Sequence, residues 1–256
     1  MARPPAPDPW AALASATPAR IALGRAGPGL PTRASLAFAL DHARARDAVH
    51  EPLDVAALIG DIGLPVQVVA SAAQDRTTYL TRPDLGRQLS PASAASLEAD
   101  TPCDLVIVLA DGLSARAARL QGPPVIAAIL DELADFAPGP IIIATQARVA
   151  LGDEIGAALK ARYVAVLIGE RPGLSTPDSL GIYLTRDPAI GRSDAERNCI
   201  SNIHAGGLSA AQAARRLAWL MREAERRGAT GVELKDESDT DQGRLTGQAS
   251  GSQLLE

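Results

Sequence analysis

Residues 105–109 read Leu-Val-Ile-Val-Leu, residues 141–143 read Ile-Ile-Ile, and residues 164–168 read Val-Ala-Val-Leu-Ile. Short continuous apolar runs rich in β-branched residues are typical of strands that are buried on both faces of a sheet. Helical patterns lie between these runs, one following Pro123-Pro124 and one beginning near Asp153-Glu154. Because strands that alternate with helices run parallel in one sheet, the centre of the chain is predicted to be an α/β domain.

Further elements are predicted on both sides of these runs. A strand is expected at 180–185, and a helix is expected to begin at Ser209 and to end at Gly228. Upstream, the spacing of apolar residues predicts helices at 32–49 and 51–60. The predicted fold is therefore a Rossmann- or flavodoxin-like parallel sheet flanked by helices, with a small helical N-terminal region.

Composition divides the chain into four parts. Residues 1–19 are rich in proline and poor in large apolar side chains, which predicts a flexible N-terminal arm. Residues 20–100 form the helical lead-in, and residues 101–232 form the α/β domain. The chain is acidic from residue 233 and later rich in Gly, Ser and Gln, so residues 233–256 are predicted to be a flexible tail.

The overall composition excludes several classes of protein. The chain has 256 residues, a net charge of −5 and only two Trp, three Tyr and two Phe, so nucleic acid is not an expected partner. It has no apolar run of membrane-spanning length and no secretory signal pattern, so a cytoplasmic location without membrane contact is expected. Its two cysteines, Cys103 and Cys199, have neither disulfide-framework nor zinc-site spacing, and no metal site is predicted.

The segments that follow the predicted strands are the candidate ligand site. In an open α/β sheet, ligands bind beyond the carboxyl ends of the strands. Those segments here are residues 110–114, 145–149 and 169–173. Gly112 and Ser114 are candidate ligand contacts on position alone, although ordinary strand-to-helix turns would explain each segment equally well.

Familiar enzymatic motifs do not match this sequence. The glycines of residues 24–29 lack the order and the preceding strand of a dinucleotide or phosphate loop. Gly112-Leu113-Ser114 lacks the second glycine of a nucleophile elbow and has no recognisable triad order, so no catalytic residue is assigned. The thiol of Cys199 is either buried and inert or has a pKa lowered by Arg197, and Glu170 either binds a ligand or pairs with Arg171.

Longer stretches of the sequence carry a resemblance to a known family. In order along the chain, they resemble the small (light) subunit of ethanolamine ammonia-lyase over roughly residues 20–237. The stretches that carry this resemblance are residues 23–27, 41–50, 148–156, 166–175, 177–181, 194–203 and 217–224. Ordered similarity over this length is far more specific than a short motif.

The resemblance implies a radical enzyme that requires adenosylcobalamin (coenzyme B12). Members of this family convert ethanolamine to acetaldehyde and ammonia, with the substrate bound in a TIM-barrel large subunit. The small subunit holds the corrinoid at the interface between the two, within a hetero-oligomer of several large and small subunits. The lead-in at residues 20–100 is then expected to contact the large subunit, in the cytoplasm or within a bacterial microcompartment.

The family's cobalamin contacts carry over to three residues of this chain. They match Val149 in the Arg148-Val149-Ala150 loop, Glu170 in the turn after the third strand, and Cys199. Together with Gly112 and Ser114, which are inferred from position alone, they form the predicted cofactor-binding set. The sequence contains no Asp-x-His-x-x-Gly motif, so the resemblance implies that the cofactor keeps its own lower base.

One alternative of a different class stays open. A stand-alone flavodoxin-like module could bind a nucleotide or a flavin at the same strand ends. It would require a Gly-rich phosphate loop that opens a helix, and no such loop is evident. The two hypotheses differ in whether a partner subunit is needed.

Overall fold

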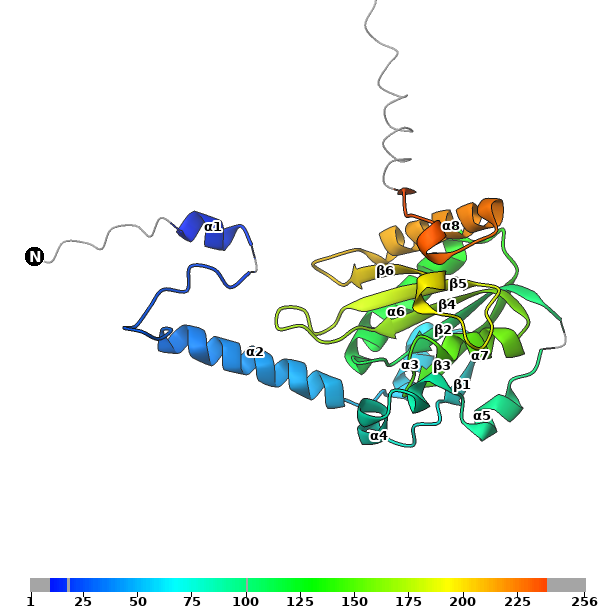
Figure 1. Cartoon of the computed structure of the whole chain (residues 1–256), viewed down its shortest axis with the longest axis horizontal. Helices are drawn as coiled ribbons and strands as arrows, with labels where there is room; N and C mark the ends of the chain where they lie inside the picture. Colours follow the sequence, from blue (N-terminus) through cyan, green and yellow to red (C-terminus); the bar gives the residue numbers. More distant parts are fainter. Residues whose placement is uncertain (1–9, 18, 100, 239–256) are drawn as a thin grey trace, which may run out of the picture.

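The computed structural model describes residues 10–17, 19–99 and 101–238 and is built on one six-stranded sheet (Figure 1). The order of the strands across the sheet is β1-β3-β2-β4-β5-β6. Their bounds are β1 Val66–Ala70, β2 Cys103–Ala110, β3 Pro138–Thr145, β4 Ala161–Gly169, β5 Leu180–Arg186 and β6 Arg197–Ile203. The three apolar runs of the sequence are thus β2, β3 and β4, with β2 between the other two.

The sheet is mixed rather than wholly parallel. Strands β1, β3, β2 and β4 pair in parallel, whereas β5 is antiparallel to both β4 and β6. The prediction of a parallel sheet is therefore wrong at this edge. The connections at 170–179 and 187–196 are too short for a helical crossover, and a short connection brings the next strand back antiparallel. The broader prediction of an α/β sheet flanked by helices is confirmed.

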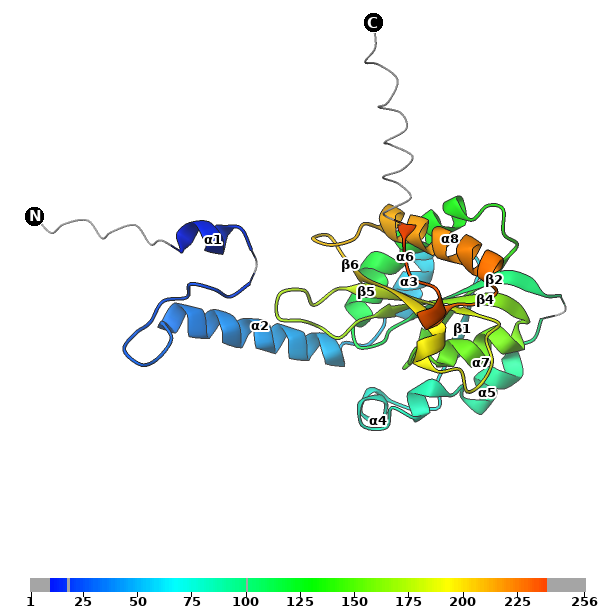
Figure 2. The same ribbon diagram turned by 45° about the horizontal axis from the view of Figure 1, so that its top comes forward.

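Helices cover both faces of the sheet (Figures 1 and 2). Helices α6 (Ala115–Glu132), α8 (Ala210–Arg227) and α3 (Val55–Ile62) pack on one face, and α7 (Leu151–Ala158) packs on the other. Side chains of β2 alternate between the two cores. Those of Leu105, Ile107 and Leu109 enter the first core, and those of Val106 and Val108 enter the second. Burial on both faces explains why this strand is continuously apolar.

Helix α6 begins earlier than the sequence predicts. The predicted start is at Pro123-Pro124, but both prolines lie inside the helix. Ser114 caps it instead, because its side-chain oxygen accepts a hydrogen bond from the Ala117 N–H at 3.2 Å. The two prolines deprive the carbonyls of Arg119 and Leu120 of their helical donors, and both residues are exposed, so water can replace those donors.

The last long helix has the predicted bounds. Ser209 caps α8 with a capping box that involves Gln212, and the helix ends at Gly228, whose φ of 74° lies in the left-handed region. Residues beyond it continue to pack, since the Leu234 side chain is 2% exposed. The rest of the predicted tail, residues 239–256, lies outside the described residues, as do residues 1–9 of the predicted arm.

The helical lead-in extends away from the sheet (Figures 1 and 2). Helix α2 (Thr32–His50) has one buried residue, Ala48, and the short α1 (Ala11–Ser15) lies further out. Arg20 contacts the sheet domain by donating to the Ser175 hydroxyl at 3.4 Å. The remaining short elements are α4 Arg76–Thr81, α5 Pro91–Ser96 and the 3-10 helices η1 Leu85–Arg87, η2 Asp194–Glu196 and η3 Gly231–Glu233. Within the described ranges, no helix is both long and apolar enough to cross a membrane.

Two glycine substitutions should change stability in opposite directions. Gly228→Ala places a side chain at a positive φ and is expected to lower the free energy of unfolding by about 1 kcal/mol. Gly60→Ala lies in the interior of α3 with open space around it and is expected to raise that free energy by about 0.5–1 kcal/mol. Urea unfolding of both variants checks this. If both variants change the free energy of unfolding equally, the left-handed C-cap of α8 does not require glycine at position 228.

Candidate functional site

The point where the strand order reverses lies between β2 and β4. The chain passes from β2 to β3 on one side and then crosses to β4 on the other side of β2. Such a switch point is the usual ligand crevice of an open α/β sheet. Here the two loops at that point are in contact, because the Leu113 N–H donates to the Gly169 carbonyl at 2.9 Å. The chain's own backbone therefore fills this part of the crevice.

Two of the predicted residues lie in that closed contact. Gly112 has a φ of 53°, and a Cβ there would lie 2.3 Å from the Gly169 oxygen, so only glycine fits. Ser114 is fully buried, and its hydroxyl donates to the Pro177 carbonyl at 2.9 Å while it caps α6. Both residues hold the loop at 170–179 against the end of β2.

A buried carboxylate fixes the neighbouring loop, which carries Val149. Asp111 accepts hydrogen bonds from the backbone N–H groups of Gln146 and Ala147 at 2.9 and 3.1 Å, and Arg76 lies 3.4 Å from it. Burial raises the pKa of Asp111, although these N–H groups and Arg76 act in the opposite direction. The sequence reasoning did not single out Asp111, despite its place directly after a buried strand.

The other three predicted residues lie around one tyrosine on β5. Tyr183 pairs with Cys199 across β5 and β6, so both side chains are on the same face of the sheet. Val149 and Tyr183 line the same groove. Glu170 is also close, because its Oε1 and the Tyr183 ring lie 3.0 and 3.5 Å from where a Cβ on Gly181 would be. The structure thus brings together residues from three separate parts of the chain.

Glu170 is held in one orientation. Its carboxylate accepts a hydrogen bond from the Ser179 hydroxyl at 2.6 Å, and its backbone N–H donates to the Ser179 carbonyl at 2.9 Å. The missing side chain of Gly181 leaves room for the Glu170 side chain beside the sheet. Ser179, rather than Arg171, is therefore the recorded hydrogen-bond partner of this carboxylate.

Cys199 is exposed, and its thiol is not activated by Arg197. Although the residue is exposed, partial desolvation of its sulfur raises the pKa of Cys199. A hydrogen bond between the Tyr183 hydroxyl and this sulfur opposes that effect, while the nearby Glu170 adds to it. Of the two alternatives for this thiol, a pKa lowered by Arg197 is not what the structure has, because the Arg197 guanidinium is directed toward Asp153. At neutral pH the thiol is therefore mainly protonated and is a weak nucleophile.

A buried ion pair lies on the same face of the sheet as Tyr183 and Cys199, two residues further along β5 and β6. Arg197 donates to both carboxylate oxygens of Asp153 at 2.6 and 2.7 Å, and both side chains are at most 3% exposed. The same guanidinium donates to the Thr185 hydroxyl and the Arg192 carbonyl, both at 2.9 Å. Because Asp153 is in the first turn of α7 and Arg197 begins β6, the pair fixes the loop that ends at Val149 relative to the strand that carries Cys199. We refer to it as the Arg197–Asp153 pair.

The groove beside Tyr183 has a volume of about 520 Å³ and is open on one side. Its lining combines apolar surface with charges of both signs. The lining residues are Pro83, Asp84, Arg87, Arg148, Val149, Ala150, Tyr183 and Asp194. We call this surface, together with Glu170, Gly181 and Cys199, the Tyr183 face.

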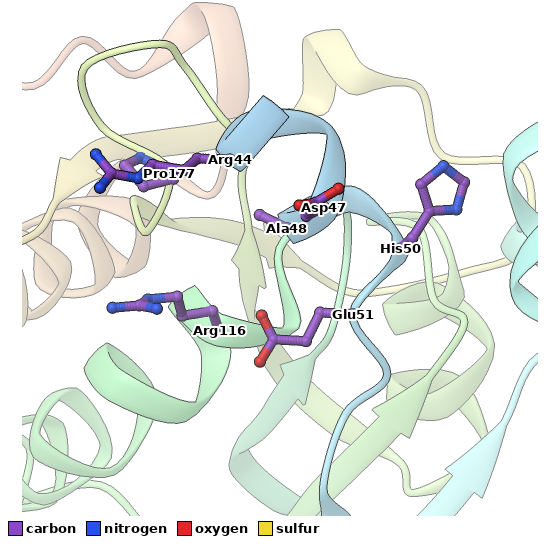
Figure 3. A pocket seen from close by; sticks show the side chains of 7 residues that line it. All are labelled: Arg44, Asp47, Ala48, His50, Glu51, Arg116 and Pro177. Atoms are coloured by element: carbon purple, nitrogen blue, oxygen red, sulfur yellow. The ribbon is translucent and has the colours of Figure 1, made fainter. Parts of the chain in front are cut away.

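A larger cavity of about 860 Å³ lies elsewhere, between the end of α2, the start of α6 and the loop at Pro177 (Figure 3). Figure 3 shows Arg44 beside Pro177 and His50 turned away from them. None of the five predicted cofactor contacts is among its described lining residues, which are Arg44, Asp47, Ala48, His50, Glu51, Arg116 and Pro177. The cavity belongs to the junction of the lead-in with the sheet domain.

These features define a class of protein: an α/β chain with a six-stranded mixed sheet, helices on both faces and an open groove of about 520 Å³ beside β5. The sequence profile of the family described as ethanolamine ammonia-lyase light chain matches residues 7–235. The chain therefore belongs to this family, whose enzyme is a carbon–nitrogen lyase that works as a complex of subunits.

Individual relatives are similar over nearly the whole chain. The ethanolamine ammonia-lyase small subunit of Bradyrhizobium diazoefficiens is 56% identical over 88% of this chain and 90% of its own. Those of Azotobacter vinelandii and Rhodopseudomonas palustris are 52% and 56% identical over 97% and 87% of this chain, and 95% and 88% of their own.

Breaking the Arg197–Asp153 pair should strongly destabilise the chain. Asp153→Ala leaves a buried arginine without its counter-charge and is expected to lower the free energy of unfolding by about 3–5 kcal/mol. Asp135→Ala removes one partner of Arg222 in a pair that is at least half exposed, and it is expected to leave the free energy of unfolding almost unchanged. Urea unfolding measures both. Similar losses for the two variants would show that the buried pair does not anchor the Tyr183 face.

Proposed function

We propose that this chain holds the corrinoid of adenosylcobalamin against a TIM-barrel large subunit in an enzyme that converts ethanolamine to acetaldehyde and ammonia. The observation that carries the proposal is the grouping of Val149, Glu170 and Cys199 around Tyr183. The resemblance implies these three residues as cofactor contacts, and they come from three separate parts of the chain. Membership of the light-chain family supports the same role.

The Tyr183 face fits one side of a corrin ring. Val149 and the Tyr183 ring offer apolar contact, and Glu170, whose side chain lies against Gly181, offers a hydrogen-bond acceptor to a ring amide. A groove of about 520 Å³ is within the range of roughly 300–1,000 Å³ that suits drug-sized ligands, which are much smaller than a corrinoid. The opposite side of the ring therefore needs cover from the large subunit.

When bound, the cofactor supplies the radical chemistry by homolysis of its cobalt–carbon bond. The residues of this chain bind and orient the ring and keep water from one side of it. Gly112 and Ser114 do not contact the ring in this proposal. They fix the loop that carries Glu170. We propose that the cofactor keeps its own lower base, because the sequence lacks the Asp-x-His-x-x-Gly motif.

The lead-in is proposed to contact the large subunit. Its exposed large apolar side chains are more numerous than a free surface usually presents. They include Ile21, Leu23, Leu30, Leu36, Phe38 and Leu40, which are between 39% and 65% exposed.

We propose the four-part division of the chain given above. We also propose a hetero-oligomer of several large and small subunits, located in the cytoplasm or in a bacterial microcompartment.

We also propose that the parallel strands β3, β2 and β4 with their two crossover helices represent a Rossmann- or flavodoxin-like core. Their order places the switch point between β2 and β4. The alternative function, a stand-alone nucleotide or flavin module, requires space for a phosphate at that point. The contact of Gly112 with Gly169 fills this space and disfavours the alternative.

Activity should require both subunits. We expect acetaldehyde release from ethanolamine and adenosylcobalamin when this chain is co-expressed with the large subunit, and none from either protein alone. Glu170→Ala is expected to weaken cofactor binding by the assembled enzyme about tenfold, the equivalent of one charge-assisted hydrogen bond of about 1.4 kcal/mol. Val232→Ala, at an exposed site on η3, is the control. Folded proteins that do not co-purify or react would contradict the proposal.

The cofactor should protect one of the two cysteines from alkylation. In the assembled enzyme, iodoacetamide is expected to label Cys199 more slowly when cobalamin is present, while labelling of the half-buried Cys103 is unchanged and serves as an internal reference. Because the raised pKa leaves little thiolate at neutral pH, labelling without cofactor should increase between about pH 7 and about pH 9. Peptide mass spectrometry measures both sites. Equal rates of Cys199 labelling with and without cobalamin would show that Cys199 is not part of the cofactor site.

A further inference from the structure

Tyr183 adjoins all three resemblance-derived contacts of the Tyr183 face, Val149, Glu170 and Cys199. It pairs with Cys199 across the strands, lines the groove with Val149, and has its ring beside the Glu170 carboxylate at Gly181. The sequence reasoning did not select it, although it lies within the predicted strand at 180–185. Its side chain is half-buried, so the ring is fixed while part of it stays accessible.

We infer that Tyr183 and Glu170 form a recognition pair for a primary amide at the rim of the corrinoid, an inference that rests on the proposed function. A primary amide carries two N–H donors and one carbonyl acceptor. Glu170 supplies the acceptor for an amide N–H, and the Tyr183 hydroxyl supplies the donor for the amide oxygen. Several peripheral side chains of a corrinoid end in such amides. The pair would therefore bind a chemical group that occurs more than once around the ring.

The surroundings hold each member of the pair in the state that this task requires. The Ser179 hydroxyl occupies Glu170 Oε2 at 2.6 Å and leaves Oε1, the oxygen next to Gly181, for a ligand. Burial raises the pKa of Tyr183, with further contributions from Cys199, Glu170 and Asp194, so the phenol keeps its proton. An amide oxygen is a better hydrogen-bond acceptor than the Cys199 sulfur. A bound amide can therefore replace that sulfur as the acceptor of the Tyr183 hydroxyl hydrogen.

The pair should also reject a carboxylate at the same position. A carboxylate has no proton to donate to Glu170 and brings a like charge close to it, and a site built for a hydrogen bond rejects analogues that leave its buried groups unpaired. The Tyr183 hydroxyl alone cannot offset that repulsion. Tyr183 and Glu170 would therefore distinguish an intact corrinoid from one in which a side-chain amide has been hydrolysed.

The test uses the co-expressed complex of both subunits and two kinds of unreactive probe. The probes are cyanocobalamin and its separated monocarboxylic acids, in each of which one side-chain amide is hydrolysed. Equilibrium dialysis, read by corrin absorbance, gives dissociation constants without any turnover. We expect the wild-type complex to bind at least one of the acids about tenfold more weakly than cyanocobalamin, since one hydrogen bond and one like-charge contact are involved.

Two variants separate the roles of the pair, and a third is the matched control. Tyr183→Phe is expected to weaken cyanocobalamin binding about five- to tenfold. Glu170→Gln is expected to reduce the discrimination between cyanocobalamin and that acid. Tyr163→Phe removes a hydroxyl in the opposite core, where it bonds Glu225 at 2.9 Å, and should leave both constants unchanged.

The outcomes distinguish this inference from the proposed function. If the wild-type complex assembles but binds no corrinoid, the proposed function itself fails. If the wild type binds and Tyr183→Phe binds equally well, only the role of Tyr183 is overturned. If Tyr183→Phe binds more weakly but Glu170→Gln discriminates as the wild type does, Tyr183 contacts the ring but the amide recognition by the pair is overturned.

Discussion

The buried pair of Arg197 and Asp153 joins the two parts of the chain on which the site depends. Asp153 follows the loop that carries Val149, and Arg197 begins the strand that carries Cys199. Burying two charges costs free energy of folding unless their geometry and further hydrogen bonds compensate. Here Arg197 donates to both carboxylate oxygens of Asp153, to Thr185 and to the Arg192 carbonyl. A bidentate contact also restricts orientation, so α7 and β6 have one relative placement.

A second set of contacts places Glu170. The loop at 170–179 touches the end of β2 through Gly112 and Ser114, and Ser179 fixes the carboxylate itself. The tip of the same loop receives Arg20 from the lead-in, which also pairs with Asp41 of α2 at 2.7 Å. The segment proposed to meet the large subunit and the loop that carries Glu170 are thus in direct contact.

The Tyr183 face is the surface on which the proposed function of this chain rests. Its groove is open on one side, and Cys199 is exposed. Under the proposed function, a large, flat cofactor needs contacts on both sides of its ring, and this chain would supply those on one side. Ring orientation, amide contacts and exclusion of water from that side are tasks that a preorganised surface can perform, while substrate chemistry would stay with the partner subunit.

Local sequence was sufficient for the strands and helices whose signal is local. The three apolar runs predicted β2, β3 and β4 because burial on both faces requires continuous apolar residues, and Ser209 and Gly228 predicted the ends of α8 because caps act within one turn. The resemblance supplied Val149, Glu170 and Cys199, and position alone supplied Gly112 and Ser114. Strand direction at β5 and β6, the true start of α6 and the partner of Arg197 were missed. Strand direction depends on the length of the connections, and the start of α6 depends on a serine cap that precedes two prolines. The partner of Arg197 depends on a contact between residues 44 positions apart. Such long-range pairings leave no periodic pattern in the sequence, so they emerge when the sheet assembles.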